Sequence, residues 1–249
     1  TPSACASGDE IADWSENWDK SDSFPEGWKV TNNVTGDYPV HHPWIVTTAP
    51  APHEGNAAFV KNPSSGGGAS AGQDQSASTL LESPEVELSS DASFFKFTHQ
   101  VATETDFDGG NLKVSINGGE FAIVPSSAIT FNPYTSTLLA APDNTNPIAG
   151  EEAFSGSDQG ESFGSWATTI VDLAAVGAKK GDKIKFRFDY GQDVATGYVG
   201  WYIDDMSVLH CGARAGNKSL LKPGRFGGAF CFGLLLPLFG LAALRLRRS

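Results

Sequence analysis

The residues best suited to chemistry are three acids at alternate positions near the middle of the chain, Glu104, Asp106 and Asp108, followed directly by two glycines. Acids at this spacing can project their carboxylates together, and hard oxygens of this kind suit Ca²⁺. Asp204 and Asp205 could add a ligand, because one of two consecutive strand residues must face inward. The sequence therefore predicts a structural Ca²⁺ site at these five acids, against the alternative of surface acids and turn-capping aspartates.

A second motif has the spacing of a serine nucleophile. Residues 160–164 read Gly-Glu-Ser-Phe-Gly and match G-x-S-x-G, and Asp172, Asp193 or Asp204 and then His210 follow in hydrolase order. The motif needs a strand before it and a helix after it to expose the serine. A Gly-Ser-Asp loop precedes it here and a β-rich stretch follows, so we expect no catalytic residue in this chain.

Histidines and tryptophans offer weaker signals. The five histidines form no H-E-x-x-H pattern, and the adjacent pair His41 and His42 could hold a surface metal but is more typical of a loop. Several tryptophans could line a sugar platform by ring stacking or could fill the core. These are Trp14, Trp18, Trp44, Trp166 and Trp201.

Charge is divided unevenly along the chain. The net charge is −12, but residues 1–211 hold all 29 acids and 10 of the 17 Lys and Arg, which is a formal −19, whereas residues 212–249 carry +7. Binding to phosphates needs a basic face, so the acidic body excludes nucleic acid as a partner. Such a surface suits solubility outside the cell and divalent cations.

The body alternates apolar and polar residues with a period of two. Ile184, Phe186 and Phe188 alternate with basic residues, and residues 111–117 alternate in the same way before an Asn-Gly-Gly turn. This pattern predicts strands at residues 27–30, 44–46, 56–60, 80–83, 86–88, 94–99, 111–117, 121–124, 166–173, 183–190 and 200–208. We therefore expect an all-β fold, an antiparallel β-sandwich of the jelly-roll kind, with a long loop over residues 125–165.

The C-terminal segment has the composition of a membrane span. Residues 226–244 are 19 residues without a charge, enough as a helix for a hydrocarbon core of roughly 30 Å. Arg245, Arg247 and Arg248 follow, and the positive-inside rule places them in the cytoplasm and the body outside. A buried core helix is the alternative, but a buried terminal helix with no polar face would not be expected to end in a cluster of arginines. Cys231 within the span is read as a small apolar residue rather than a lipidation site.

The order of Gly227-Gly228, an apolar span and a terminal Arg-Leu-Arg-Arg-Ser resembles the GlyGly-CTERM sorting signal of gram-negative exported proteins. The resemblance implies a rhombosortase-type intramembrane protease as a partner, which cuts near the glycine pair. It also implies localisation to the inner membrane through the C-terminal helix, followed by display at the cell surface or secretion after cleavage.

Three cysteines, Cys5, Cys211 and Cys231, are present. Cys5 comes just before the first segment of the body and Cys211 just after its last predicted strand. In a sandwich whose first and last strands are neighbours these ends meet, and an exported protein permits oxidation. The sequence predicts a Cys5–Cys211 disulfide, with two unpaired thiols as the alternative.

Several short segments of the body follow one another in a recognisable order over residues 11–210, at 24–28, 42–44, 97–99, 106–112, 116–119, 146–150, 153–156 and 200–208. In this order they resemble the MAM-like jelly-roll domains of bacterial secreted proteins. Such domains often lie C-terminal to fungalysin-type or immune-inhibitor-A-type metallopeptidases and to subtilases. The resemblance implies a non-catalytic accessory domain, and it also favours a structural calcium.

Together these observations predict the organisation of the chain. We expect an N-terminal flank at 1–10, a MAM-like β-sandwich at 11–211, a linker at 212–225, a transmembrane helix at 226–244 and a basic cytoplasmic tail at 245–249. The chain starts at Thr1 rather than at an initiator Met, so we expect an upstream part that holds a peptidase. A stand-alone adhesin or carbohydrate-binding surface protein is the alternative, with a surface glycan or protein as ligand; a complete hydrolase is a third.

Overall fold

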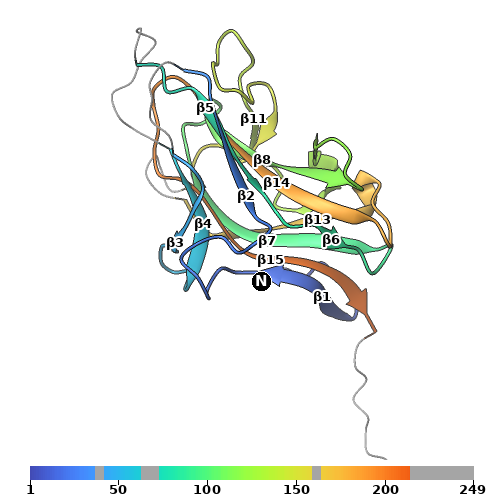
Figure 1. Cartoon of the computed structure of the whole chain (residues 1–249). Coiled ribbons are helices and arrows are strands. Elements are labelled where there is room, and N and C mark those ends of the chain that lie inside the picture. Colours follow the sequence, from blue (N-terminus) through green and yellow to red (C-terminus); the bar gives the residue numbers. More distant parts are fainter. Residues whose placement is uncertain (37–41, 63–72, 159–163, 214–249) are drawn as a thin grey trace, which may run out of the picture. The chain divides into compact units, whose positions relative to one another are not determined.

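The computed structural model describes residues 1–36, 42–62, 73–158 and 164–213, which all belong to one unit, Thr1–Ala215. Within these residues the chain forms two antiparallel sheets (Figure 1). The first sheet runs in the order β10 (Ile129–Phe131), β13 (Ala167–Asp172), β7 (Ser93–Ala102), β15 (Gly200–Gly212), β4 (Asn56–Lys61) and β3 (Ile45–Thr48), with β1 (Asp9–Glu16) paired to β15.

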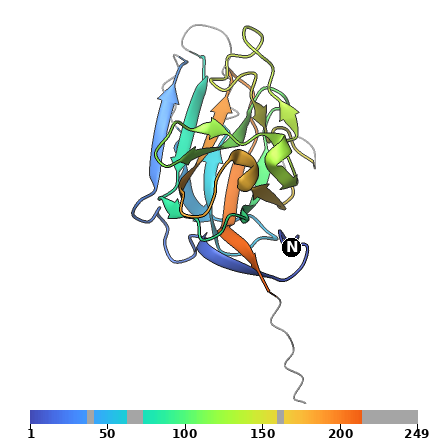
Figure 2. The same cartoon turned by 90° about the vertical axis from the view of Figure 1, so that its right-hand side faces the viewer.

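The second sheet runs in the order β2 (Lys29–Val34), β5 (Ala77–Glu82), β14 (Lys183–Gln192), β8 (Gly109–Ile116) and β9 (Ala122–Ile123), with β6 (Val86–Glu87) paired to the start of β14. A small separate pair joins β11 (Ser136–Thr137) to β12 (Glu152–Ala153). Two short 3₁₀ helices, η1 (Ser126–Ala128) and η2 (Ala174–Val176), complete the described elements. In Figure 2, turned by 90° from Figure 1, the sheets overlap, one behind the other.

The core lies between the two sheets and is made by the residues that alternate inward. Phe95 and Phe97 on β7 and Phe186 and Phe188 on β14 have no exposed area. The rings of Phe95 and Phe186 stack across the gap with their centroids 3.8 Å apart. The predicted antiparallel β-sandwich is thus confirmed, because period-two alternation buries one face of each sheet against the other.

Each predicted strand range overlaps a strand of the structure, whereas four strands were not predicted: β1, β10, β11 and β12. β1 reads DEIADWSE and pairs with the far half of β15. Its acidic residues disfavour a strand, so the strand forms because β15 offers it a partner. β15 continues to Gly212 rather than ending at Val208, and β1 pairs with this longer second half. The 125–165 region contains the other three, all of two or three residues.

The pairing of β1 with β15 brings the ends of the body together. Glu10 lies opposite Cys211 in the register, and Cys5 and Cys211 form a disulfide with Cα atoms 5.6 Å apart. That separation is the usual one for a disulfide. The bridge encloses nearly the whole sandwich, with a sequence separation of 206 residues.

Most of the tryptophans belong to the core. Trp18, Trp44 and Trp201 are at most 2% exposed, and Trp14 packs against the core from the side. Trp166 instead stacks on a histidine outside it. A sugar platform built from all five is therefore ruled out by their burial.

Part of the sequence-based interpretation falls outside the described residues. The expected span at 226–244, Gly227, Gly228 and the three terminal arginines lie in this part of the chain, as do His41 and Ser162. Among the described residues, no helix has the length and apolar character needed to cross a membrane.

Candidate functional site

A cluster of three carboxylates lies where β14 ends and β8 begins. Glu104, Asp108 and Asp193 each offer an oxygen, and these oxygens all lie within 4.8 Å of one another. Glu104 and Asp108 come from the loop between β7 and β8, and Asp193 follows the end of β14. The sequence analysis predicted the first two as metal ligands but did not connect Asp193 with them.

The sheet register explains why Asp193 belongs to the cluster. β14 and β8 are antiparallel, and Gly191 pairs with Gly109. Asp193, just after β14, and Asp108, just before β8, are therefore brought side by side. The run Tyr-Gly-Gln-Asp begins at Tyr190, the last residue of the predicted strand, and places Asp193 just after it. Only the pairing of β14 with β8 shows that this acid lies beside Asp108.

Asp108 is the buried centre of the cluster, with no exposed area. Its Oδ2 accepts a hydrogen bond from Asn62 Nδ2 at 2.8 Å, and its Oδ1 accepts one from the backbone N–H of Asp193 at 2.6 Å. The Asn62 side chain is itself held by Tyr198 N, which donates to Asn62 Oδ1 at 2.8 Å. Each Asp108 oxygen keeps a second lone pair available for a cation.

All three carboxyl groups are harder to ionise than usual. Burial raises the pKa of Asp108 well above its usual range, and the charges of Asp193 and Glu104 raise it further. The pKa of Glu104 is raised by burial and then by Asp193, and that of Asp193 by burial and then by Asp74. None of the ion pairs between described residues involves these three acids.

This donor set has the chemistry of a Ca²⁺ site. Three carboxylates close together in a buried position need a cation or protons to offset their repulsion. Calcium takes oxygen ligands of this type. The geometry therefore supports Glu104, Asp108 and Asp193 as the residues that would hold a structural calcium.

The other predicted ligands lie elsewhere. Asp106 has a positive φ of 67°, and its carboxylate accepts a hydrogen bond from Ser136 Oγ rather than joining Glu104 and Asp108. Asp204 and Asp205 form a separate group with His53. The five acids predicted as one site are therefore divided among three places.

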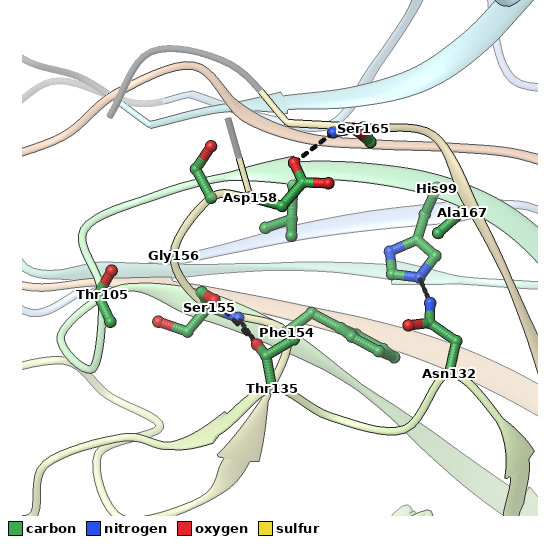
Figure 3. Close-up of a pocket in the computed structure, with 12 residues that line it drawn as sticks. His99, Thr105, Asn132, Thr135, Phe154, Ser155, Gly156, Asp158, Ser165 and Ala167 are labelled. Atoms are coloured by element: carbon green, nitrogen blue, oxygen red, sulfur yellow. Dashed lines mark hydrogen bonds between the residues drawn. The ribbon is translucent and has the colours of Figure 1, made fainter. Parts of the chain in front are cut away.

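A pocket of about 290 Å³ adjoins the loop at residues 103–108, which carries Glu104 and Asp108 and is called the carboxylate loop below (Figure 3). In Figure 3, Thr105 and Gly156 stand on one side and His99 and Ala167 on the other. Its walls combine hydroxyl groups, one amide, one carboxylate and two rings. The lining residues are His99, Val101, Thr105, Asn132, Thr135, Phe154, Ser155, Gly156, Ser157, Asp158, Ser165 and Ala167.

Ser155 connects the pocket to the carboxylate loop. Its Oγ accepts from the backbone N–H of Asp106 at 2.9 Å and donates to the carbonyl of Asp108 at 2.7 Å. Thr103 Oγ1 also donates to that carbonyl, at 2.9 Å, and accepts from Gly156 N at 3.0 Å. The wall of the pocket and the backbone of the candidate metal site are thus one hydrogen-bonded unit.

His99 in this pocket is a neutral group. Burial lowers its pKa to about 3. Trp201 Nε1 can only donate and lies 3.1 Å from His99 Nδ1, so the proton is assigned to Nε2, 2.9 Å from Thr169 Oγ1. Near neutral pH this imidazole therefore provides fixed hydrogen bonds and no acid–base catalysis.

The described residues do contain one Ser–His–Asp contact, but its geometry is not that of a triad. His210 Nδ1 lies 2.9 Å from Asp13 Oδ2 and 3.2 Å from Ser89 Oγ. A triad needs the serine and the acid on different ring nitrogens, so that a proton can pass across the imidazole. Both partners share Nδ1 here. The His210 contact is therefore a side-chain hydrogen bond that joins β1 to β15.

Comparison with known proteins gave structural neighbours only. No family model matches the chain, and no curated protein matches it. A cleaved adhesin domain of Lys-gingipain from Porphyromonas gingivalis is 17% identical over 83% of this chain and all of that domain, with a TM-score of 0.42. A xylan-binding domain from Paenibacillus barcinonensis is 10% identical over 84% of this chain and all of that domain, also with a TM-score of 0.42. Identities and TM-scores this low assign no function.

Proposed function

We propose that the body is a non-catalytic, calcium-stabilised binding domain of an exported surface protein, and that its pocket binds part of a carbohydrate. The observation that carries this proposal is the pocket of Figure 3, whose lining residue Ser155 is hydrogen-bonded to the carboxylate loop.

The chemistry of the lining fits a sugar. Sugar hydroxyls both donate and accept hydrogen bonds, as does the hydroxyl group of Thr105. The hydroxyls of Thr135 and Ser155 already donate to backbone carbonyls, so they can offer only an acceptor. Asp158 adds an acceptor.

The half-buried side chains of Val101 and Ala167 offer an apolar surface to the C–H face of a sugar ring, whereas Phe154 belongs to the core and is only 1% exposed. A volume of about 290 Å³ lies near the lower end of small-molecule sites.

Calcium has a defined part in this proposal. Bound to Glu104, Asp108 and Asp193, it would neutralise their repulsion and hold the loop whose Asp106 N–H and Asp108 carbonyl contact Ser155. We therefore expect ligand binding at the pocket to require calcium, although the ion and the ligand do not share ligating residues.

Hydrolysis is the less favoured function, on geometric grounds. Paired carboxylates for glycoside hydrolysis must reach the substrate from both sides. Asp108 has no exposed area, and hydrogen bonds from Asn62 and Asp193 already hold it. His99 is neutral and buried. These groups build a binding surface rather than a reaction centre.

The finer parts of the sequence-based interpretation belong to the same proposal. This body would be the accessory domain of a secreted enzyme if three expectations hold. They are the MAM-like relationship, a peptidase encoded upstream, and a C-terminal span cut by a rhombosortase-type protease. A surface adhesin without an enzyme is the alternative. The sequence upstream of Thr1 would distinguish an adhesin from the accessory domain of an enzyme better than the identity of the ligand would.

The test is glycan binding with and without calcium. The purified chain is applied to an array of glycans, and the best glycan is then titrated calorimetrically. Ala167→Phe should fill the pocket and abolish binding, whereas Ala12→Phe, at an exposed position on β1, should retain it. Binding by the wild type should also be lost in chelator. If Ala167→Phe and Ala12→Phe bind equally well, the glycan does not bind in this pocket. The absence of any glycan ligand would refute the carbohydrate proposal.

A further inference from the structure

A second group of ligand-type side chains lies outside the carboxylate cluster, on the opposite face of β15 from the core. His53 Nε2 is 2.7 Å from Asp204 Oδ2 and 3.7 Å from Asp205 Oδ2. All three residues offer an atom within 4.8 Å of the others. His53 belongs to the loop between β3 and β4, and the aspartates belong to β15.

A β-bulge allows two consecutive aspartates to face one histidine. Successive strand residues normally point to opposite faces of a sheet. The pairing of β15 with β7 shifts register between Asp204 and Ser207, and Asp205 has a φ of 48°. A left-handed backbone at a residue other than glycine is unfavourable by about 1 kcal/mol or more and gathers at functional sites. The bulge therefore directs the second carboxylate to where the first one lies.

The burial of Asp204 leaves an unsatisfied acceptor. Its side chain is 2% exposed, and its Oδ1 is buried with no hydrogen-bond partner. Burial raises the pKa of this carboxyl to about 7, although the contact with His53 lowers it. A buried, unpaired carboxylate oxygen is unfavourable in a folded protein, and a cation would satisfy it.

The imidazole of His53 is held in place before any ligand binds. Its ring stacks on Trp166 with centroids 4.2 Å apart and planes 22° apart. Trp166 Nε1 in turn donates to the carbonyl of Pro50 at 2.9 Å, which closes the loop over the indole. Nε2 therefore faces the aspartates, so a ligand there would not have to order this side chain.

The geometry points to a zinc site formed by His53, Asp204 and Asp205. Tetrahedral zinc bonds of about 2.0–2.2 Å place ligand atoms roughly 3.3 Å apart, and the observed separations of 2.7 and 3.7 Å lie on either side of that value. An imidazole nitrogen favours zinc over calcium, which takes oxygen ligands. Three protein ligands leave a fourth position for water. A zinc ion there would fasten the His53 loop to β15.

This site is independent of the proposed calcium site, and the experiment keeps the two apart. The full chain is stripped of metal, saturated with Ca²⁺ and titrated calorimetrically with Zn²⁺. We expect one zinc ion per chain. Asp205→Asn should weaken binding roughly tenfold or more, because asparagine tolerates the left-handed backbone but loses the charge. His53→Gln should weaken it at least as much.

His210→Gln is the matched control, since it removes a histidine that also pairs with an aspartate, and it should bind zinc like the wild type. Glu104→Gln should do so too. The inference is overturned if the wild type binds no stoichiometric zinc in the presence of calcium, or if Asp205→Asn and His53→Gln both bind it with wild-type affinity. Equal loss in His210→Gln would also overturn it.

Discussion

Replacing Glu104 by glutamine should have opposite effects with and without calcium. In chelator near neutral pH, the substitution removes one of three mutually repelling charges, so the free energy of unfolding should rise. With calcium, it removes a charged ligand, so calcium affinity and the stability gained from calcium should fall. Glu104 suits this test because its carboxylate accepts no hydrogen bond from the described residues, whereas that of Asp108 accepts two.

The size of the effect follows from the spacing of the oxygens. The oxygens lie no more than 4.8 Å apart, and two unit charges at that limit repel by about 3.5 kcal/mol at an effective dielectric of about 20 and by about 1 kcal/mol in bulk water. Glu104 is partly solvated, so we expect a gain near the lower figure, about 1 kcal/mol, in chelator. In calcium, the loss of one carboxylate should weaken binding roughly tenfold, which is about 1.4 kcal/mol.

The assay is urea unfolding of wild type and variant in EDTA and in millimolar calcium, together with calorimetric titration of calcium. Glu120→Gln is the matched control, because Glu120 is an exposed acid in the β8–β9 turn, at the other end of β8. It should change neither quantity. If Glu104→Gln lowers stability equally in both buffers, or if calcium does not stabilise the wild type, the reasoning about this cluster is wrong.

Three further predictions follow from other parts of the chain. Cys5→Ser with Cys211→Ser should lower the free energy of unfolding by about 5 kcal/mol in the chain-entropy model for a separation of 206 residues; a transition that does not respond to reductant in the wild type would contradict this. In chelator, the free energy of unfolding should fall as pH rises from about 4 to about 7. The raised carboxyl pKa values, including about 7 for Asp204, make the folded state bind protons more tightly than the unfolded one. Added calcium should reduce this dependence on pH, and a free energy of unfolding that rises over this range in chelator would refute the prediction. Replacing Gly227 and Gly228 with Leu should leave the chain uncut in the membrane, as mass spectrometry of the mature C-terminus would show; an intact Ser249 on surface-exposed wild-type protein in a cell with a rhombosortase would reduce the tail to an ordinary anchor.

Much of the sandwich could be predicted because strand signals are local. Ile184, Phe186 and Phe188 alternate within a few residues, and the same alternation determines which face of β14 is buried. The pairing of Cys5 with Cys211 could likewise be anticipated, since it needs only the neighbourhood of the first and last strands. β1 was missed because its own residues carry little strand signal and its partner supplies the pairing.

The candidate sites depended on tertiary structure, because their residues are joined by strand register and backbone conformation rather than by sequence spacing. Asp193 meets Asp108 through the pairing of β14 with β8, 85 residues away along the chain. Asp106 leaves the alternate-acid motif because of its positive φ. His53 reaches Asp204 across 151 residues, and a bulge brings in Asp205. Acid-rich composition and spacing suggested that a cation could be held, but only the register and one left-handed residue decided which side chains would hold it.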